Sequence, residues 1–266
     1  MSKRESTSYT LFFAVVVCVV CALLVAVAAV TLQPRQAAAA RLYMEKNVLL
    51  AAGLVKPGDK VTVQDVNHIF DERIRVRLVD LATGELVPKG KIDERDYDQR
   101  KARGDPGMSR RAPPNNAGIG RLPNLAVVYF IMKGAKEDTV DQIVIAVEGL
   151  GMWGTIYGFL SLDPDGNTIR GLTYYDQKET PGLGGEISNP KWQALWRGRK
   201  AYDEQWLPAI RVIKGQAGAP DADPVHVDGL SGATVTSNSI TRLMQFWLSD
   251  NGYGKFLERF REGKVS

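Results

Sequence analysis

One apolar stretch restricts this chain more than any other feature: no charged or strongly polar side chain occurs from Leu11 to Val30. A helix of that length, at about 1.5 Å per residue, measures about 30 Å, which is the thickness of a bilayer's hydrocarbon core. Backbone groups in lipid must be hydrogen-bonded within the segment, so the stretch is expected to be helical. We therefore predict a transmembrane helix over residues 11–32, preceded by a short polar segment of residues 1–10.

A cleaved signal peptide is the competing interpretation of this stretch. The small residues at 26–28 and 37–40 would suit a cleavage site, but signal peptides use only about 7–15 apolar residues. A retained anchor is therefore favoured. Basic residues flank the stretch on both sides, so the charge rule alone leaves its orientation open: Lys3, Arg4, Arg35, Arg41 and Lys46.

The two cysteines of the chain, Cys18 and Cys21, both lie in the apolar stretch and share one helix face. They could be metal or cluster ligands shared with a partner, but packing inside a membrane helix is the favoured interpretation. The rest of the chain has no cysteine, and its histidines are His68 and His226. Most metal constellations are therefore excluded, as are disulfides and thiol nucleophiles.

The remainder of the chain has the composition of one globular domain. Of 266 residues, 44% are hydrophobic and 24% are charged, which is enough apolar material for a core. The net charge of +4 comes without a basic stripe interleaved with aromatic residues, so nucleic acid is not an expected partner. We predict a linker helix over residues 33–58, after Pro34 closes the membrane span, and a single domain over residues 59–266.

Within that domain the apolar patterns predict a sheet. The turn sequence Asp163–Asn167 joins two of the expected strands in a hairpin. By contrast, residues 89–120 are rich in charge, proline and glycine and are expected to form a long exposed loop, and residues 189–206 a polar surface segment. The expected fold class is α+β, an antiparallel sheet with flanking helices, with strands at Arg73–Leu81, Leu125–Met132, Gln142–Val147, Tyr157–Leu162 and Thr168–Tyr175.

Two glycine-rich segments lie within this domain. Glycines in the segment Gly149–Gly154 would let the backbone pass close to something flat, on which Trp153 could stack, although a core position is the commoner fate of tryptophan. The segment Glu179–Glu186 contains three glycines in four residues, whose N–H groups could bind the edge of a heterocycle. A tight structural turn explains it equally well, and neither a phosphate loop nor a dinucleotide fingerprint is present.

A third segment, Asp228–Thr234, leads into an apolar helix face made by Ile240, Leu243, Met244, Trp247 and Leu248. Thr236 or Ser237 is the expected N-cap, which places Thr234 just ahead of the helix. A helix N-terminus is a good site for a phosphate, and the small neighbours of Thr234 leave its hydroxyl accessible. A plain capping loop is the alternative.

Together these segments carry a family resemblance. Gly149-Leu150-Gly151-Met152-Trp153, Glu179-Thr180-Pro181-Gly182-Leu183-Gly184-Gly185-Glu186 and Asp228-Gly229-Leu230-Ser231-Gly232-Ala233-Thr234 stand in the order seen in FMN-binding domains. Over nearly its full length, the chain resembles the C subunits of sodium-translocating NADH:quinone reductases. The G subunits of Rnf electron-transport complexes share the last two motifs.

The resemblance implies a cofactor and a role. It implies FMN bound covalently to Thr234 through a phosphoester bond, made by a separate flavin transferase from FAD with magnesium. It also implies a cytoplasmic N-terminus of residues 1–10 and a periplasmic domain on the cell inner membrane. That domain would relay electrons within a sodium-pumping NADH:ubiquinone reductase of six subunits. The expected cofactor-binding residues are Thr234, Ser231, Gly232, Ala233, Asp228, Thr180, Gly182, Leu183, Gly184, Gly185 and Trp153.

Two other classes of function remain open from the sequence. A membrane-anchored, non-redox binding protein would hold an anion at the glycine loop and leave Thr234 unmodified. A hydrolase would use Ser231 or Thr234 as nucleophile and would need His226 or His68 as its base.

Overall fold

A computed structural model describes residues 7–134 and 139–265 of the chain, in two units that divide after Met44. The basic residues Lys3 and Arg4 of the predicted cytoplasmic segment lie outside the described residues. Helix α1 (Thr7–Ala51) has an 18-residue window of mean hydropathy 3.3, none of it buried, and is long and apolar enough to cross a membrane.

Helix α1 does not end near Pro34 as predicted, because the helix continues through this proline to Ala51. Proline removes one backbone hydrogen bond from a helix interior but does not always end the helix. Here an alanine-rich stretch follows at residues 37–40, and alanine has the highest helix propensity. The expected membrane helix and linker helix are thus one helical element.

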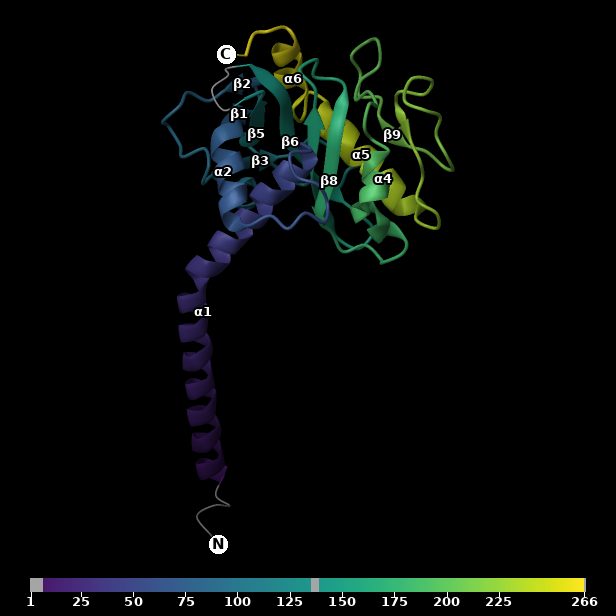
Figure 1. Cartoon of the computed structure of the whole chain (residues 1–266). Helices are drawn as coiled ribbons and strands as arrows, with labels where there is room; N and C mark the ends of the chain where they lie inside the picture. Colours follow the sequence, from purple (N-terminus) through teal and green to yellow (C-terminus); the bar gives the residue numbers. More distant parts are fainter. Residues whose placement is uncertain (1–6, 135–138, 266) are drawn as a thin grey trace. The chain divides into compact units, whose positions relative to one another are not determined.

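The second unit contains the sheet and the shorter helices (Figure 1). Its elements are α2 (Val63–Arg73), β1 (Ile74–Asp80), β2 (Glu85–Leu86), α3 (Gln99–Gly104), β3 (Ser109–Arg111), β4 (Arg121–Pro123), β5 (Leu125–Met132), β6 (Val140–Leu150), β7 (Thr155–Leu162), β8 (Ile169–Asp176), the 3₁₀ helix η2 (Gly184–Ser188), α4 (Pro190–Ala194), β9 (Arg211–Val212), β10 (His226–Val227), α5 (Thr234–Leu248) and α6 (Gly254–Arg261).

The main sheet has the strand order β2-β1-β5-β6-β7-β8, and each neighbouring pair is antiparallel. The predicted turn joins β7 to β8: the Gly166 N–H donates to the Asp163 carbonyl over 2.9 Å, and Gly166 has φ of +67°. This left-handed conformation favours glycine. The α+β fold with an antiparallel sheet and flanking helices is therefore confirmed.

Both faces of the sheet are covered. On one face α5 packs against β6 through the predicted apolar stripe, and Ile240, Leu243 and Trp247 are fully buried there. On the other face, the last turns of α1 contact the sheet: the Gln142 amide donates to the Ala52 carbonyl over 2.9 Å, just beyond the end of α1. The site described below lies where the strand β6 and the start of α5 meet the loop after β8.

The expectation of a long exposed loop over residues 89–120 is correct only in part, because most of these residues are exposed but the segment is not all loop. This segment contains α3 and β3, and it is held by charged side chains instead of an apolar periodicity. The guanidinium of Arg103 lies 2.8 Å from the buried carboxylate of Glu148, and that of Arg100 stacks 3.4 Å above the ring of Tyr157. Burial raises the pKa of Glu148, and the charge of Arg103 counteracts part of this.

The segment of residues 189–206 is not a surface segment either. Trp196 is fully buried, and Trp192 is 7% exposed. The indole N–H of Trp192 donates to the Asp228 carbonyl over 3.0 Å. The segment therefore supports the loop that leads into α5. The sequence had not indicated this contact, because the segment lacks an apolar periodicity.

Candidate functional site

The start of α5 differs from the prediction in a way that matters for binding. The helix begins at Thr234, and its N-cap is Ala233, which has no side-chain capping bond. The expected caps serve other purposes: the Thr236 hydroxyl donates to Glu179, and the Ser237 hydroxyl accepts from the Leu230 N–H over 3.2 Å. In the described chain, the N–H groups of residues 234–236 have no hydrogen-bond partner, so they remain available to a ligand.

The loop before this helix is fixed by backbone contacts. The Asp228 carboxylate accepts from the Ala217 N–H over 2.9 Å, so it braces the neighbouring loop. Within the described ranges, no group of three potential metal ligands occurs at this loop or elsewhere. Gly232 has φ of +70°, and a Cβ there would lie 3.0 Å from the Leu183 side chain. Glycine is thus required both by the turn and by the loop that packs against it.

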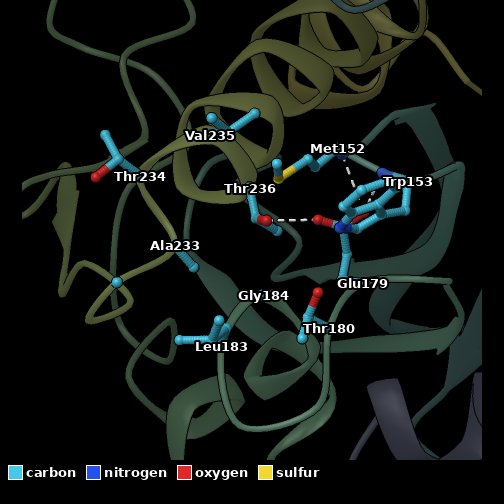
Figure 2. A pocket seen from close by; sticks show the side chains of 11 residues that line it. Met152, Trp153, Glu179, Thr180, Leu183, Gly184, Ala233, Thr234, Val235 and Thr236 are labelled. Carbon is cyan, nitrogen blue, oxygen red and sulfur yellow. Dashed lines mark hydrogen bonds between the residues drawn. The ribbon is translucent and has the colours of Figure 1, made fainter.

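A pocket of about 220 Å³ opens beside the start of α5 (Figure 2). Seven of the predicted residues line it, whereas Ser231, Asp228, Gly182 and Gly185 do not. Four residues outside the expected cofactor-binding set also line it. The complete lining is Met152, Trp153, Glu179, Thr180, Leu183, Gly184, Gly232, Ala233, Thr234, Val235 and Thr236.

Glu179 joins the three segments that form this pocket. Its side chain is buried, and Oε1 accepts from the N–H groups of Met152 (2.9 Å) and Trp153 (3.0 Å). Its Oε2 accepts from the hydroxyl of Thr236 on α5, a contact drawn at the centre of Figure 2. One carboxylate therefore connects the segment after β6, the loop after β8 and the first turn of α5.

The glycines around the pocket allow close packing against other side chains of this chain. A Cβ at Gly151 would lie 2.6 Å from Glu179 Oε1, and one at Gly184 would lie 2.4 Å from Thr236 Oγ1. A Cβ at Gly149 would lie 2.5 Å from the side chain of Leu243 on α5. The close approach predicted for the segment Gly149–Gly154 is therefore made by side chains of this chain, Leu243 and Glu179. The sequence alone did not indicate that Glu179 lies against this segment.

The glycine loop after β8 is partly a closed turn. The N–H groups of Leu183 and Gly185 both donate to the Thr180 carbonyl, over 3.1 and 2.9 Å. Among the described residues, the N–H groups of Gly182 and Gly184 have no such partner. The interpretation as a tight structural turn is therefore confirmed, and the turn leaves two N–H donors free.

An apolar rim surrounds the pocket. Trp153 is 63% exposed, so it is not a core residue, and Met152 is 55% exposed beside it. Leu183 and Val235 are exposed at 43% and 52%. In Figure 2, Thr234 lies at the end of the pocket opposite Met152 and Trp153. The site therefore combines an apolar end with a helix N-terminus at the other end.

This arrangement suits a ligand with an aromatic ring and a phosphate. The exposed Trp153 and Met152 offer a ring apolar and aromatic contact. The free N–H groups at the start of α5 favour an anion, and Thr234 is exposed beside them. Pockets that enclose a ligand usually measure about 300–1,000 Å³, so this smaller site would enclose only part of such a molecule. FMN has the chemical features that this site fits.

The histidines are not arranged for hydrolysis. His226 Nδ1 lies 2.6 Å from the Asp223 carboxylate, and its Nε2 accepts from Arg211 over 2.7 Å. His68 lies 3.5 Å from Glu72 on α2. Neither histidine is among the residues that line the pocket. A nucleophile at Ser231 or Thr234 would therefore lack a histidine base.

Comparison with known proteins gives a consistent result. Residues 151–249 match the family model described as FMN-binding domain, and this range includes every residue that lines the pocket. The chain is 41% identical to the C subunit of the Na(+)-translocating NADH-quinone reductase of Yersinia pestis, covering 99% of this chain and 96% of that one. It is 42% identical to the corresponding proteins of Pseudomonas aeruginosa and Vibrio vulnificus, over the full length of each.

Two solved structures resemble this one. The crystal structure of Shewanella oneidensis NqrC aligns with a TM-score of 0.75 at 30% identity, covering 84% of this chain and 98% of that chain. The crystal structure of the C subunit of the Na(+)-translocating NADH-quinone reductase from Parabacteroides distasonis aligns with a TM-score of 0.62 at 26% identity, covering 82% and 92%.

Proposed function

Because this chain belongs to the family of Na(+)-translocating NADH-quinone reductase C subunits, we propose that it is the membrane-anchored flavoprotein subunit of a sodium-pumping NADH:ubiquinone oxidoreductase. When bound, FMN supplies one-electron transfer, which no side chain in the pocket can provide. The chain's own part is to hold, orient and shield the flavin. The observation that carries this proposal is the uncapped N-terminus of α5, with its exposed Thr234, facing an apolar rim across one pocket.

Thr234 is the residue to which we assign the covalent phosphoester link. Its hydroxyl is exposed and follows Gly232 and Ala233, whose small side chains leave room for a large ligand. A phosphodiester retains a negative charge, which a helix N-terminus stabilises by about 0.3–1 kcal/mol. Covalent attachment also compensates for a small pocket, because a tethered flavin cannot dissociate.

The apolar rim would hold the isoalloxazine ring. Trp153 and Met152 present flat and polarizable surfaces, and Leu183 closes the pocket from the glycine loop. The free N–H groups of Gly182 and Gly184 are candidate donors to the edge of the ring. Such bonds adjust the redox potential of a flavin.

The decisive experiment compares Thr234→Ala with Thr234→Ser in the full chain, coexpressed with a flavin transferase. Flavin fluorescence in a denaturing gel reports the covalent link. We expect the alanine variant to lose fluorescence and the serine variant, which keeps a hydroxyl, to retain some of it. Retained fluorescence in Thr234→Ala contradicts the assignment, and loss in Ser231→Ala alone would move the link to Ser231.

We propose that a separate transferase attaches the flavin, as the family resemblance implies. In this proposal, the transferase also binds the magnesium that accompanies FAD. Expression without a transferase is expected to give a folded, colourless protein. A yellow protein with covalent flavin under those conditions would show that the chain modifies itself.

Anchoring and orientation form the last part of the proposal. Helix α1 would cross the cell inner membrane once, with the N-terminus in the cytoplasm and the flavin domain in the periplasm, in contact with the other members of an assembly of six subunits. Protease added to spheroplasts would digest the domain from outside if this is correct. Protection in intact spheroplasts, with digestion only after lysis, would reverse the orientation. Purification of the native complex and mass spectrometry of its subunits would identify the partners.

A further inference from the structure

We propose that Glu179 is a positioning residue whose buried carboxylate sets the geometry of the flavin pocket and lowers the reduction potential of the flavin held there. The inference rests on the proposed function, since it concerns the flavin in that pocket. It assigns a role to the first residue of the segment Glu179–Glu186, which was not among the expected cofactor-binding residues. The carboxylate lies in the pocket wall and has three hydrogen-bond donors from two other segments.

The positioning role follows from the hydrogen bonds of the carboxylate. Both Met152 and Trp153 donate their N–H groups to one oxygen, so the backbone beneath the exposed indole is fixed at two successive residues. The second oxygen accepts a hydrogen bond from the hydroxyl of Thr236, which lies two residues after Thr234 in α5. The distance between the apolar rim and the attachment residue is thus set through a single side chain.

The surrounding glycines are consistent with this role. A side chain at Gly151 or Gly184 would collide with the carboxylate or with its partner Thr236, at 2.6 and 2.4 Å. Glycine at these positions costs more conformational entropy on folding than other residues would. The need to make room for the Glu179 carboxylate and its partner Thr236 explains why glycine is present there. Gly151 and Gly184 therefore allow the carboxylate of Glu179 to lie in the wall of the pocket.

The electrostatic role follows from burial. Glu179 is 5% exposed, so water screens its charge weakly and the charge acts strongly on nearby groups. Reduction adds electron density to an isoalloxazine ring, and a fixed negative charge beside the ring opposes it. The reduction potential of the flavin is expected to be lower than it would be beside a neutral side chain.

Two substitutions separate charge from geometry. In Glu179→Gln, the amide oxygen can still accept from both N–H groups, and the amide nitrogen can donate to the Thr236 hydroxyl. The shape is retained and the charge is lost. In Thr236→Val, the carboxylate keeps its charge but loses the hydroxyl that donates a hydrogen bond to it and so weakens its field. The shape of the side chain at position 236 is almost unchanged.

The experiment is a potentiometric titration of the full-length, covalently flavinylated protein, followed by its visible spectrum. We expect the midpoint potential to rise in Glu179→Gln and to fall in Thr236→Val. Glu186→Gln is the matched control: the same charge is removed from the same loop, but this half-buried carboxylate binds Asn189 and does not line the pocket. Its shift should be clearly smaller than that of Glu179→Gln.

The outcomes are distinct. Opposite shifts in the two variants support the proposal, because a purely structural role would not reverse sign. A Glu179→Gln shift no larger than that of the control overturns it. If Glu179→Gln fails to fold, Thr236→Val decides, and an unchanged or raised potential in that variant overturns the proposal. A wild-type chain without flavin after coexpression with the transferase would instead refute the proposed function.

Discussion

The central sheet and the flavin pocket are built in different ways. Strands β5 to β8 form an antiparallel meander in which each strand pairs with the next along the chain. The pocket combines residues 152–153, 179–184 and 232–236, which are distant in sequence, and they meet at the carboxylate of Glu179. Stability in the sheet is spread over many apolar contacts, whereas the geometry of the pocket depends on a few polar ones. A substitution in the sheet should therefore mainly lower stability, and a substitution in the pocket should mainly change flavin binding.

The largest expected effect is on the sheet. Leu160 in β7 is fully buried in the main core, and Leu160→Ala should lower the free energy of unfolding by about 2–5 kcal/mol through lost burial and a cavity. Urea unfolding followed by circular dichroism measures this change. Covalent flavin should persist in the folded fraction. The control Val235→Ala removes an exposed side chain at the pocket rim and should change stability by less than about 0.5 kcal/mol.

Gly151→Ala should affect both regions and so tests how separate they are. The new Cβ would lie 2.6 Å from Glu179 Oε1, and relieving that collision should cost about 1–3 kcal/mol. The displaced carboxylate would lose its bonds to the segment after β6. We expect a lower melting temperature together with altered flavin fluorescence in the native state. Gly120→Ala, with nothing near its Cβ position, is the control, and equal effects in both variants would contradict a specific collision.

Thr236→Val should have a smaller effect on stability than on the flavin. It removes one buried hydrogen bond to the carboxylate of Glu179, and a hydrogen bond to a charged group contributes about 1.5–3 kcal/mol. Chemical denaturation of the apoprotein measures the loss without the cofactor. A loss above about 4 kcal/mol would show that the pocket contributes to stability as much as the sheet does.

The smallest expected effect lies in the turn between β7 and β8. Burial raises the pKa of Asp165, but bonds from Thr168 and Asn167 outweigh this and lower it. A lowered folded-state pKa stabilises the protein above the unfolded pKa, and this contribution is lost as the pH falls. Asp165→Asn should therefore cost less than about 1 kcal/mol near neutral pH, since the side chain is partly exposed. The difference from wild type should shrink towards pH 3 in thermal unfolding, and a difference that grows there would contradict it.

The sequence predicted the sheet well because the relevant signals are local. A continuous apolar run with β-branched residues marked β5 at its observed bounds, and the Asp-Gly turn marked the hairpin between β7 and β8. The apolar stripe of α5 was also correct, since all five of its predicted residues are buried. Predictions failed where order depends on distant polar partners. The segment of residues 89–120 is held by Arg103 on Glu148, and Trp192 is buried against Asp228.

The family resemblance of its motifs pointed to Thr234 as the candidate attachment residue. The sequence by itself determined the apolar N-terminal helix, the strands and the amphipathic α5. These features depend on composition and spacing along one segment, which is all that local periodicity can report. Only the tertiary structure decided that α5 begins at Thr234 without a side-chain cap, that Trp153 is exposed, and that Glu179 connects the three segments of the pocket. The last of these features requires hydrogen-bond donors 84 residues apart, the backbone N–H of Met152 and the hydroxyl of Thr236, to meet at one carboxylate. Folding supplies that proximity, and no single segment encodes it.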